Sequence, residues 1–170
     1  MRIFLTILIL VLFSCSGDEK SKLPEMSAKE LQEKLLQANK NALSKEKQQI
    51  AAYIKEKQLE VITTKTGLNY KVYNNVEGDS IKDNHIVAIN YSVSLLDGTE
   101  CYNTEGKPEE FTVGKDYVES GLHEAIKYLN KGDKAIIIIP SHLGHGLTGD
   151  FKKIPIRSTI IYDLEVVEVK

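Results

Sequence analysis

The sequence predicts an α+β fold in which a curled antiparallel β-sheet wraps around one short helix, with an N-terminal helical segment ahead of it. Two observations carry this prediction. Apolar residues recur at helical spacing as far as about Gln58, and beyond Glu60 they alternate with a period near two residues. Only one further helical stripe follows, between the middle strands and the last pair of strands, which is the order of an α+β domain.

Residues 1–14 are typical of an export signal. Arg2 supplies a positive charge, and the run from Ile3 to Phe13 is apolar except for Thr6. This run is too short to span a membrane permanently, which takes about 20 residues. The end of the signal, Leu12-Phe13-Ser14-Cys15, resembles the lipobox of bacterial lipoproteins, and that resemblance implies lipidation at Cys15. An ordinary secretory signal with an incidental cysteine is the alternative.

Composition and charge limit the classes of partner. The chain has 170 residues, 42% of them hydrophobic, which suits one main core plus an appendage. A formal net charge of -2 leaves no basic excess for a phosphate backbone, so proteins or peptides are expected as partners and nucleic acid is not. Cys101 is the only cysteine besides Cys15, so no disulfide is expected in a lipidated chain. Residues 15–26 are expected to form a tether.

Residues 27–60 carry the signals of a long helix. Ser27 and Glu30 form a capping-box pattern at its start. Apolar residues follow at helical spacing, namely Leu31, Leu35, Ala38, Ala42, Ile50, Tyr53 and Ile54. A break near Asn41 or Ser44 is left open. The stripe is expected to pack on the domain or on a second copy of the chain, the latter giving a homodimer; a dedicated partner-binding helix is the alternative.

Residues 61–170 carry the pattern of one β-rich domain. Strands are predicted at Val61–Thr64, Leu68–Tyr73, Ile86–Leu95, Glu110–Val113, Ala135–Ile139 and Thr159–Val166. Asp97-Gly98 predicts a hairpin turn after the third of these strands. The single helix is predicted from about Asp116 to Tyr128, because apolar residues share one stripe there before Gly132 ends it.

A specific order of short motifs runs through this domain. The motifs are Tyr91; Leu96-Asp97-Gly98-Thr99; Phe111-Thr112-Val113-Gly114; Gly121-Leu122 with Glu124-Ala125; Leu129 with Gly132-Asp133-Lys134-Ala135; Ile139-Pro140-Ser141-His142-Leu143; Gly146; Ile154-Pro155; and Tyr162-Asp163-Leu164-Glu165. With them the domain resembles the FK506-binding-protein (FKBP) class of peptidyl-prolyl cis-trans isomerases.

The arrangement of the whole chain extends this resemblance. A lipobox, a charged helix and this domain together resemble the FKBP lipoproteins of Bacteroidetes, including the one associated with gliding motility. The resemblance implies a folding factor for exported proteins, held by lipid in the bacterial cell envelope. The outer membrane is the expected location, on its periplasmic face or at the cell surface.

The chemistry of the FKBP class needs no metal, cofactor or nucleophile. Rotation about an X-Pro amide faces a barrier of about 18–20 kcal/mol, and an apolar, dry pocket favours the twisted amide because twisting lowers the polarity of the carbonyl. The resemblance assigns catalytic positions to Tyr91, Tyr102, Glu119, His145 and Tyr162. It assigns substrate-binding positions to Cys101, Phe111, Val118, Leu122 and Ile154. The backbone N–H of Glu119 is the implied donor to the peptide carbonyl, and Leu122 is the implied floor.

Four positions depart from the pattern of the family. Cys101-Tyr102 stands where the family has Phe-Asp, Glu109 replaces an aromatic wall, and His145 replaces a tyrosine that donates to the ligand. Polar groups in a pocket that works by being dry are expected to reduce catalysis. The alternative function is therefore a weakly catalytic or non-catalytic polypeptide-binding chaperone or assembly factor that uses the same cleft and the N-terminal helix.

Three other signals carry less weight. The run from Gly144 to Gly149 satisfies the G-x-G-x-x-G pattern, but Pro140 ends the preceding strand and no helix is predicted after it, which disfavours a dinucleotide site. His142 and His145 lie on a loop without a cysteine ligand nearby, which disfavours a metal site. Cys101 is expected to act as a small apolar group rather than as a reactive thiol.

Overall fold

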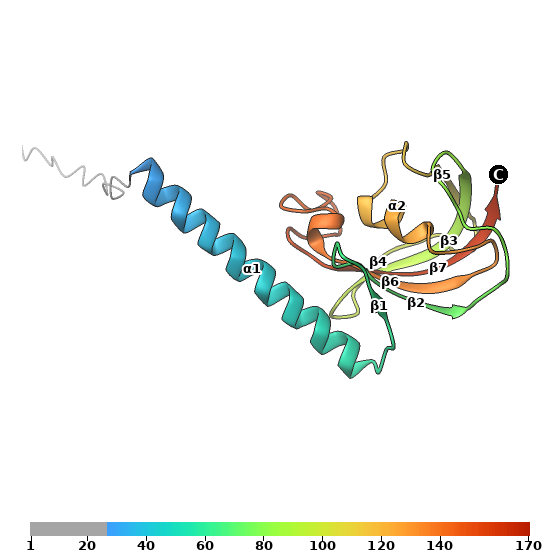
Figure 1. Ribbon diagram of the computed structural model, residues 1–170, viewed down its shortest axis with the longest axis horizontal. Coiled ribbons are helices and arrows are strands. Elements are labelled where there is room, and N and C mark those ends of the chain that lie inside the picture. Colours follow the sequence, from blue (N-terminus) through green and yellow to red (C-terminus); the bar gives the residue numbers. More distant parts are fainter. Residues whose placement is uncertain (1–26) are drawn as a thin grey trace, which may run out of the picture. The chain divides into compact units, whose positions relative to one another are not determined.

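The computed structural model describes residues 27–170 of the chain (Figure 1). The predicted signal peptide, Cys15 and the predicted tether lie outside these residues. By its internal contacts the chain divides into two compact units, one ending at Gln37 and the other comprising residues 38–170. Within the described part, no helix combines the length and the apolar character that crossing a membrane would take.

The first element is one continuous helix, α1 (Ala28–Glu56). The backbone N–H of Glu30 donates to the Ser27 hydroxyl oxygen at 3.2 Å, so the predicted cap is present. The helix is continuous at Asn41 and Ser44, the two positions near which the sequence allowed a break.

The second half of α1 belongs to the larger unit. Ile50 is buried and packs with Ile138 and Ile161 of the sheet. The Glu46 carboxylate is also buried and accepts hydrogen bonds from the Ser141 N–H, the Ser141 hydroxyl and the Thr159 hydroxyl at 2.7, 3.0 and 2.8 Å. By internal contacts the division between the two units falls inside the helix, at 37/38. The domain boundary at 60/61 that the sequence suggests stays a prediction.

Seven strands form one antiparallel sheet: β1 (Ile62–Thr63), β2 (Asn69–Asn74), β3 (Ile86–Leu95), β4 (Glu100–Asn103), β5 (Glu109–Thr112), β6 (Lys134–Ile139) and β7 (Ile160–Val169). Their order is β1-β2-β6-β7-β3-β4, and β5 pairs with the first half of β3. Strand β3 pairs with β7 along one edge and with β4 and β5 along the other, and the sheet as a whole curves around α2 (Ser120–Ile126) (Figure 1).

Strand β6 shows why its sequence is an unbroken apolar run. Ile137 and Ile139 belong to the main core on the inner face, whereas Ile136 and Ile138 face α1 on the outer face. A strand that is covered on both faces has no polar side, so the alternation expected of a half-exposed strand is lost.

The helix inside the curl, α2 (Ser120–Ile126), is shorter than the predicted segment from Asp116 to Tyr128. Asp116 instead shapes the turn before it, because its carboxylate accepts a hydrogen bond from the Thr112 N–H at 2.6 Å. Gly121 lets α2 approach β6 closely: a Cβ there would lie 2.5 Å from a methyl carbon of Ile139. A short 3-10 helix, η1 (Ser141–Leu143), follows β6 where the sequence predicted only a loop.

Candidate active site

A cavity of about 740 Å³ opens between the inner face of β3, the start of α2 and the loop 144–152. The strand register explains which side chains face it. Val93 lies directly opposite Tyr102 of β4 and Tyr162 of β7, so these three side chains share one face of the sheet. Tyr91 and Ile89 follow at the same phase along β3, and all five residues line the cavity, which we call the cleft.

The floor and walls of the cleft are apolar and aromatic. Leu122, only 3% exposed, forms the floor from α2, and Phe111 and Val118 lie beside it. The rings of Tyr91 and Tyr162 contact one another with centroids 5.3 Å apart and planes inclined by 54°. The proline-sized space that the family resemblance implies is therefore bounded by rings and aliphatic groups.

Glu119 links two walls of the cleft through its side chain. One carboxylate oxygen lies 2.9 Å from the His145 Nε2 atom, and the other accepts a hydrogen bond from the Tyr162 hydroxyl at 3.1 Å. Burial, together with the charge of Glu119, raises the pKa of the Tyr162 hydroxyl far above its ordinary value. Tyr162 consequently stays protonated and acts as a donor.

The backbone of Glu119 precedes the first turn of α2 in an extended conformation, with φ -59° and ψ 139°. Within residues 27–170, the Glu119 N–H donates no hydrogen bond to another group. Glu119 lines the cleft, and its N–H is left available for the peptide carbonyl that the resemblance assigns to it, an assignment that stays a prediction.

Glu109 reaches the cleft from β5. Its carboxylate accepts a hydrogen bond from the Tyr91 hydroxyl at 2.8 Å. Burial and this hydrogen bond raise the pKa of the Tyr91 hydroxyl well above its ordinary value. The residue that replaces an aromatic wall thus brings a negative charge to the rim and holds Tyr91 in place.

Tyr102 lines the cleft and its hydroxyl donates to the Asp150 carboxylate. Burial opposes ionisation of Asp150, but hydrogen bonds from Tyr102 and from the N–H groups of Lys152 and Ile154 outweigh it and lower the Asp150 pKa to about 2. Gly149 makes this loop possible, because its φ is +68° and a Cβ would lie 2.3 Å from the Ile154 carbonyl oxygen. The cleft therefore has a carboxylate, that of Asp150, beside Tyr102, the residue that stands where the family has aspartate.

Eight of the ten residues assigned from the sequence line the cleft, namely Tyr91, Tyr102, Phe111, Val118, Glu119, Leu122, His145 and Tyr162. Cys101 and Ile154 do not, because both are buried in the core behind it, 1% and 3% exposed. Burial also raises the pKa of the Cys101 thiol, which fits an inert apolar group. The sequence missed Asp150 and the roles of two side chains, the carboxylates of Glu109 and Glu119.

The competing signals find no support in the described part of the chain. The glycine pattern from Gly144 to Gly149 follows η1 and leads into irregular backbone up to β7, so no helix N-terminus is available there for a pyrophosphate. His142 Nε2 donates to the Thr66 carbonyl oxygen, 3.0 Å away, and His142 lies outside the cleft. Among residues 27–170, no group of three or more His, Cys, Asp or Glu side chains is placed to hold a metal ion.

Comparison with known proteins agrees with this geometry. The family model for FKBP-type peptidyl-prolyl cis-trans isomerases matches residues 78–167, more than half of the chain. The chain belongs to this family. The matched segment contains all ten residues assigned to the site from the sequence, so the FKBP resemblance is confirmed at the level of the family.

FKBP-type relatives of known name are similar over most of the chain. FkpA of Escherichia coli K12 is 36% identical over 114 residues, which are 67% of this chain and 42% of FkpA. FkpA of Buchnera aphidicola subsp. Acyrthosiphon pisum is 34% identical over 164 residues, 91% of this chain and 67% of that protein. This chain therefore spans less than half the length of the Escherichia coli relative.

Solved structures confirm the FKBP-like fold. The crystal structure of FkpA from Escherichia coli matches with a TM-score of 0.66 and 32% identity, covering 86% of this chain and 74% of that one. A peptidyl-prolyl cis-trans isomerase from Pseudomonas syringae pv. tomato matches with a TM-score of 0.67 at 22% identity, covering 77% of this chain and 95% of that one. The α+β fold with one helix inside a curled sheet, predicted from the sequence, is confirmed.

Proposed function

We propose that the protein is a peptidyl-prolyl cis-trans isomerase that accelerates rotation about X-Pro bonds in polypeptides. The cleft carries this proposal, because aromatic rings and aliphatic side chains line it and the backbone N–H of Glu119, a residue that also lines it, has no other acceptor in the described chain. A proline ring fits between Tyr91, Leu122 and Tyr162, and the Glu119 N–H holds a carbonyl of the peptide. None of these groups needs to form a covalent bond with the substrate.

The cleft would accelerate rotation by favouring the twisted amide. The planar amide has a large dipole because of resonance, and that dipole is well solvated in water. A twisted amide has a less polar carbonyl and a more basic nitrogen, so transfer to an apolar cleft costs it less free energy. The Tyr162 and Tyr91 hydroxyls are uncharged near neutral pH at the ordinary pKa of tyrosine, and the cleft raises that pKa further, so these walls stay suited to an apolar ring.

A protease-coupled assay on a proline tetrapeptide tests the proposal. We expect the chain without its signal peptide to increase the cis-to-trans rate in proportion to its concentration. Val118→Glu, which places a charge in the cleft, should abolish the increase, whereas Val167→Glu on the exposed part of β7 should not. A rate equal to the uncatalysed one for the unaltered chain would refute isomerase activity.

The proposed location is the bacterial cell envelope, with the protein anchored by lipid on Cys15 and acting on exported proteins. The lipobox-like Leu12-Phe13-Ser14-Cys15 supports this, and several acyl chains on one residue would anchor stably. Labelling of cells with an alkyne fatty acid should mark the protein, and Cys15→Ala should abolish the label and release the protein from membranes. Retention of Cys15→Ala in the outer membrane fraction would contradict the anchor. Protease added to intact cells distinguishes the cell surface from the periplasmic face.

A second candidate function is polypeptide binding without turnover, through the cleft and α1. Two observations favour it. Polar groups, Glu109 and the Glu119–His145 pair, lie in the cleft, and Leu31, Leu35 and Leu36 are about half exposed on α1. These leucines would also suit a homodimer through the helix. Suppression of aggregation by Val118→Glu, the variant expected to lose isomerase activity, would favour this candidate. Leu31→Glu with Leu35→Glu should reduce both the molar mass in solution and the suppression.

A further inference from the structure

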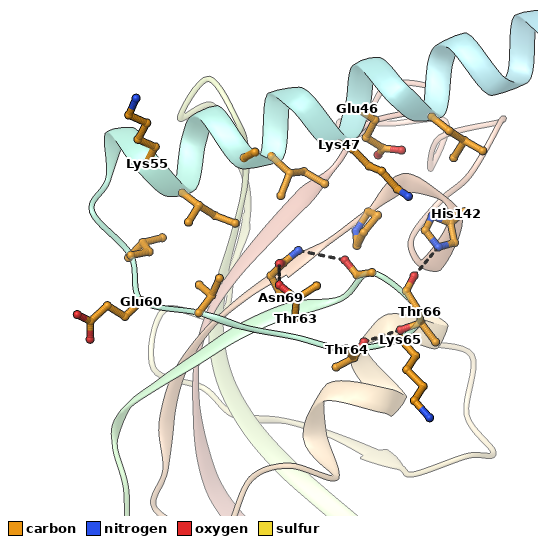
Figure 2. Close-up of a pocket in the computed structure, with 18 of the residues that line it drawn as sticks. Glu46, Lys47, Lys55, Glu60, Thr63, Thr64, Lys65, Thr66, Asn69 and His142 are labelled. Atoms are coloured by element: carbon orange, nitrogen blue, oxygen red, sulfur yellow. Dashed lines mark hydrogen bonds between the residues drawn. The ribbon is translucent and has the colours of Figure 1, made fainter.

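A second cavity, about 860 Å³ in volume, lies within the 38–170 unit on the opposite face of the sheet from the cleft. The second half of α1 forms one side, and the segment from Gln58 to Asn69, which includes edge strand β1, forms the other (Figure 2). Pro140 and His142 also line it. We call this cavity the helix groove.

The surface of the helix groove is largely apolar. Ile50 is buried at its base, Ile54, Leu59 and Val61 are half-buried along it, and Leu43 is 45% exposed at its rim. The polar side chains at its base are occupied: Thr63 donates to the Asn69 side chain at 2.6 Å, and Asn69 donates to the Gly67 carbonyl at 3.0 Å (Figure 2). The groove therefore offers apolar contact at its base, with a volume in the range of known ligand pockets.

Strand β1 leaves backbone groups without a strand partner beside the groove. It is the edge strand and pairs only with β2. The Thr64 N–H donates to the Leu68 carbonyl at 2.9 Å, so Thr63, one residue earlier, directs its own N–H and C=O away from β2. Thr63 is exposed and lines the groove. An extended peptide chain is the ligand that supplies complementary N–H and C=O groups to such an edge.

The rim of the helix groove is positively charged. Lys47 and Lys55 contribute from α1 and Lys65 from the β1–β2 turn, and in Figure 2 Lys47 reaches from the helix towards that turn. None of the three lies within ion-pair distance of a carboxylate in residues 27–170. Glu46 is turned inward to Ser141 and Thr159, so Glu60 is the one carboxylate of the rim facing solvent in the described chain. The excess of lysines favours acidic side chains in a ligand.

We propose that the helix groove binds an extended polypeptide segment that carries alternating apolar and acidic side chains. The apolar side chains pack on the base, the backbone pairs with the edge of β1, and the acidic side chains face the lysines. The groove and the cleft adjoin at η1, because Pro140 and His142 line the groove and Gly144 and His145, which follow η1 in the chain, line the cleft. One polypeptide can thus be held in the groove while a proline farther along it occupies the cleft.

Binding is tested with a fluorescein-labelled octapeptide of alternating leucine and aspartate, added to the chain without its signal peptide. Fluorescence anisotropy should show saturable binding, at least about tenfold tighter than that of the leucine–lysine octapeptide. Lys47→Glu with Lys65→Glu should weaken binding about tenfold or more. Lys40→Glu with Lys45→Glu is the matched control, because it makes the same change of net charge on exposed residues outside the groove and should leave binding unchanged.

Three outcomes overturn the proposal. The first is no saturable binding of the leucine–aspartate peptide. The second is equal weakening by the two lysine pairs, which would show a diffuse effect of net charge. The third is that the unaltered protein self-associates, does not bind the peptide, and loses its self-association in Lys47→Glu with Lys65→Glu. That result would show that the groove holds a second copy of the chain.

The link between groove and cleft rests on the proposed isomerase function and is measured separately. A substrate with a leucine–aspartate segment joined to a proline reporter should have a KM about tenfold lower than the proline tetrapeptide, with kcat unchanged. Lys47→Glu with Lys65→Glu should raise the KM of the long substrate only. Failure of isomerase activity would remove turnover of both substrates but not binding of the octapeptide, whereas equal KM values for both substrates would refute the link alone.

Discussion

At the scale of single residues, the cleft is shaped by three carboxylates that hold tyrosines. Glu109 accepts from Tyr91, Glu119 accepts from Tyr162, and Asp150 accepts from Tyr102. The tyrosines could be assigned to the site from the sequence, because Tyr91 and Tyr162 match family motifs and Tyr102 stands where the family has aspartate. Glu109 and Glu119 were also named from the sequence, but the pairing of the carboxylates with the tyrosines was not predictable. Tyr102 and Asp150 are separated by 48 residues and Tyr162 and Glu119 by 43, and only folding brings them together.

The Tyr102–Asp150 hydrogen bond can be measured through the pKa of Asp150. Its folded-state value of about 2 lies below the ordinary 3.8, so its hydrogen bonds stabilise the fold fully above 3.8 and lose that contribution as the pH falls through about 2. Tyr102→Phe removes one donor and should raise the pKa towards the ordinary value. A carboxyl-carbon NMR titration checks this, and an unchanged pKa in Tyr102→Phe would show that the backbone donors alone set it.

Glu109 gives a prediction about catalysis. Its charge at the rim opposes the dry environment that favours a twisted amide, and an aromatic side chain there would restore a wall. We expect Glu109→Phe to raise kcat/KM on a neutral proline peptide about three- to tenfold, which is at most about 1.4 kcal/mol. Glu100→Phe, at an exposed position of β4 outside the cleft, serves as the control. A fall in kcat/KM for Glu109→Phe would show that its hydrogen bond to Tyr91 matters more than the apolar wall.

At the scale of elements, the helix and strand positions follow closely from periodicity, and the ends of elements do not. The predicted strand Ile86–Leu95 is β3 with the same bounds. Helix α2 begins later than its apolar stripe suggests because Asp116 binds the backbone of Thr112. The part of α1 that belongs to the larger unit was also not predictable, because Glu46 meets Ser141 across 95 residues of sequence.

Glu46 gives a prediction about how α1 is fastened to the sheet. Glu46→Ala leaves the Ser141 N–H and two hydroxyls without their buried acceptor, and we expect the free energy of unfolding to fall by about 2–4 kcal/mol. Urea unfolding measures this. Glu56→Ala, an exposed glutamate of the same helix, should change it by no more than about 0.5 kcal/mol. Equal effects of the two substitutions would contradict the role of Glu46, and Glu46→Gln should recover part of the loss because its amide oxygen still accepts.

At the scale of the whole molecule, the family is recognisable from the sequence because its motifs cover the cleft, whereas the limits of the folding unit are not. The family motifs identify the residues that line the cleft and the turns that connect the strands around it. The second half of α1 lies outside the segment that matches the family, yet Ile50 is buried against Ile138 and Ile161. Periodicity predicts that a helix has an apolar face, but it does not say how much of that face the domain covers.

The limits of the folding unit can be tested by shortening the chain at 37/38 and at 60/61. Residues 38–170 keep Glu46 and Ile50, so we expect the same urea midpoint and the same isomerase rate as for the longer chain. Residues 61–170 expose Ile138 and Ile161 and leave Ser141 without its acceptor, so we expect the free energy of unfolding to fall by at least about 3 kcal/mol. A tyrosine fluorescence melt of both chains, with the isomerase assay on the folded fraction, measures the two effects. Equal stability of the two chains would show that α1 only rests on the sheet and that the domain begins after Glu60.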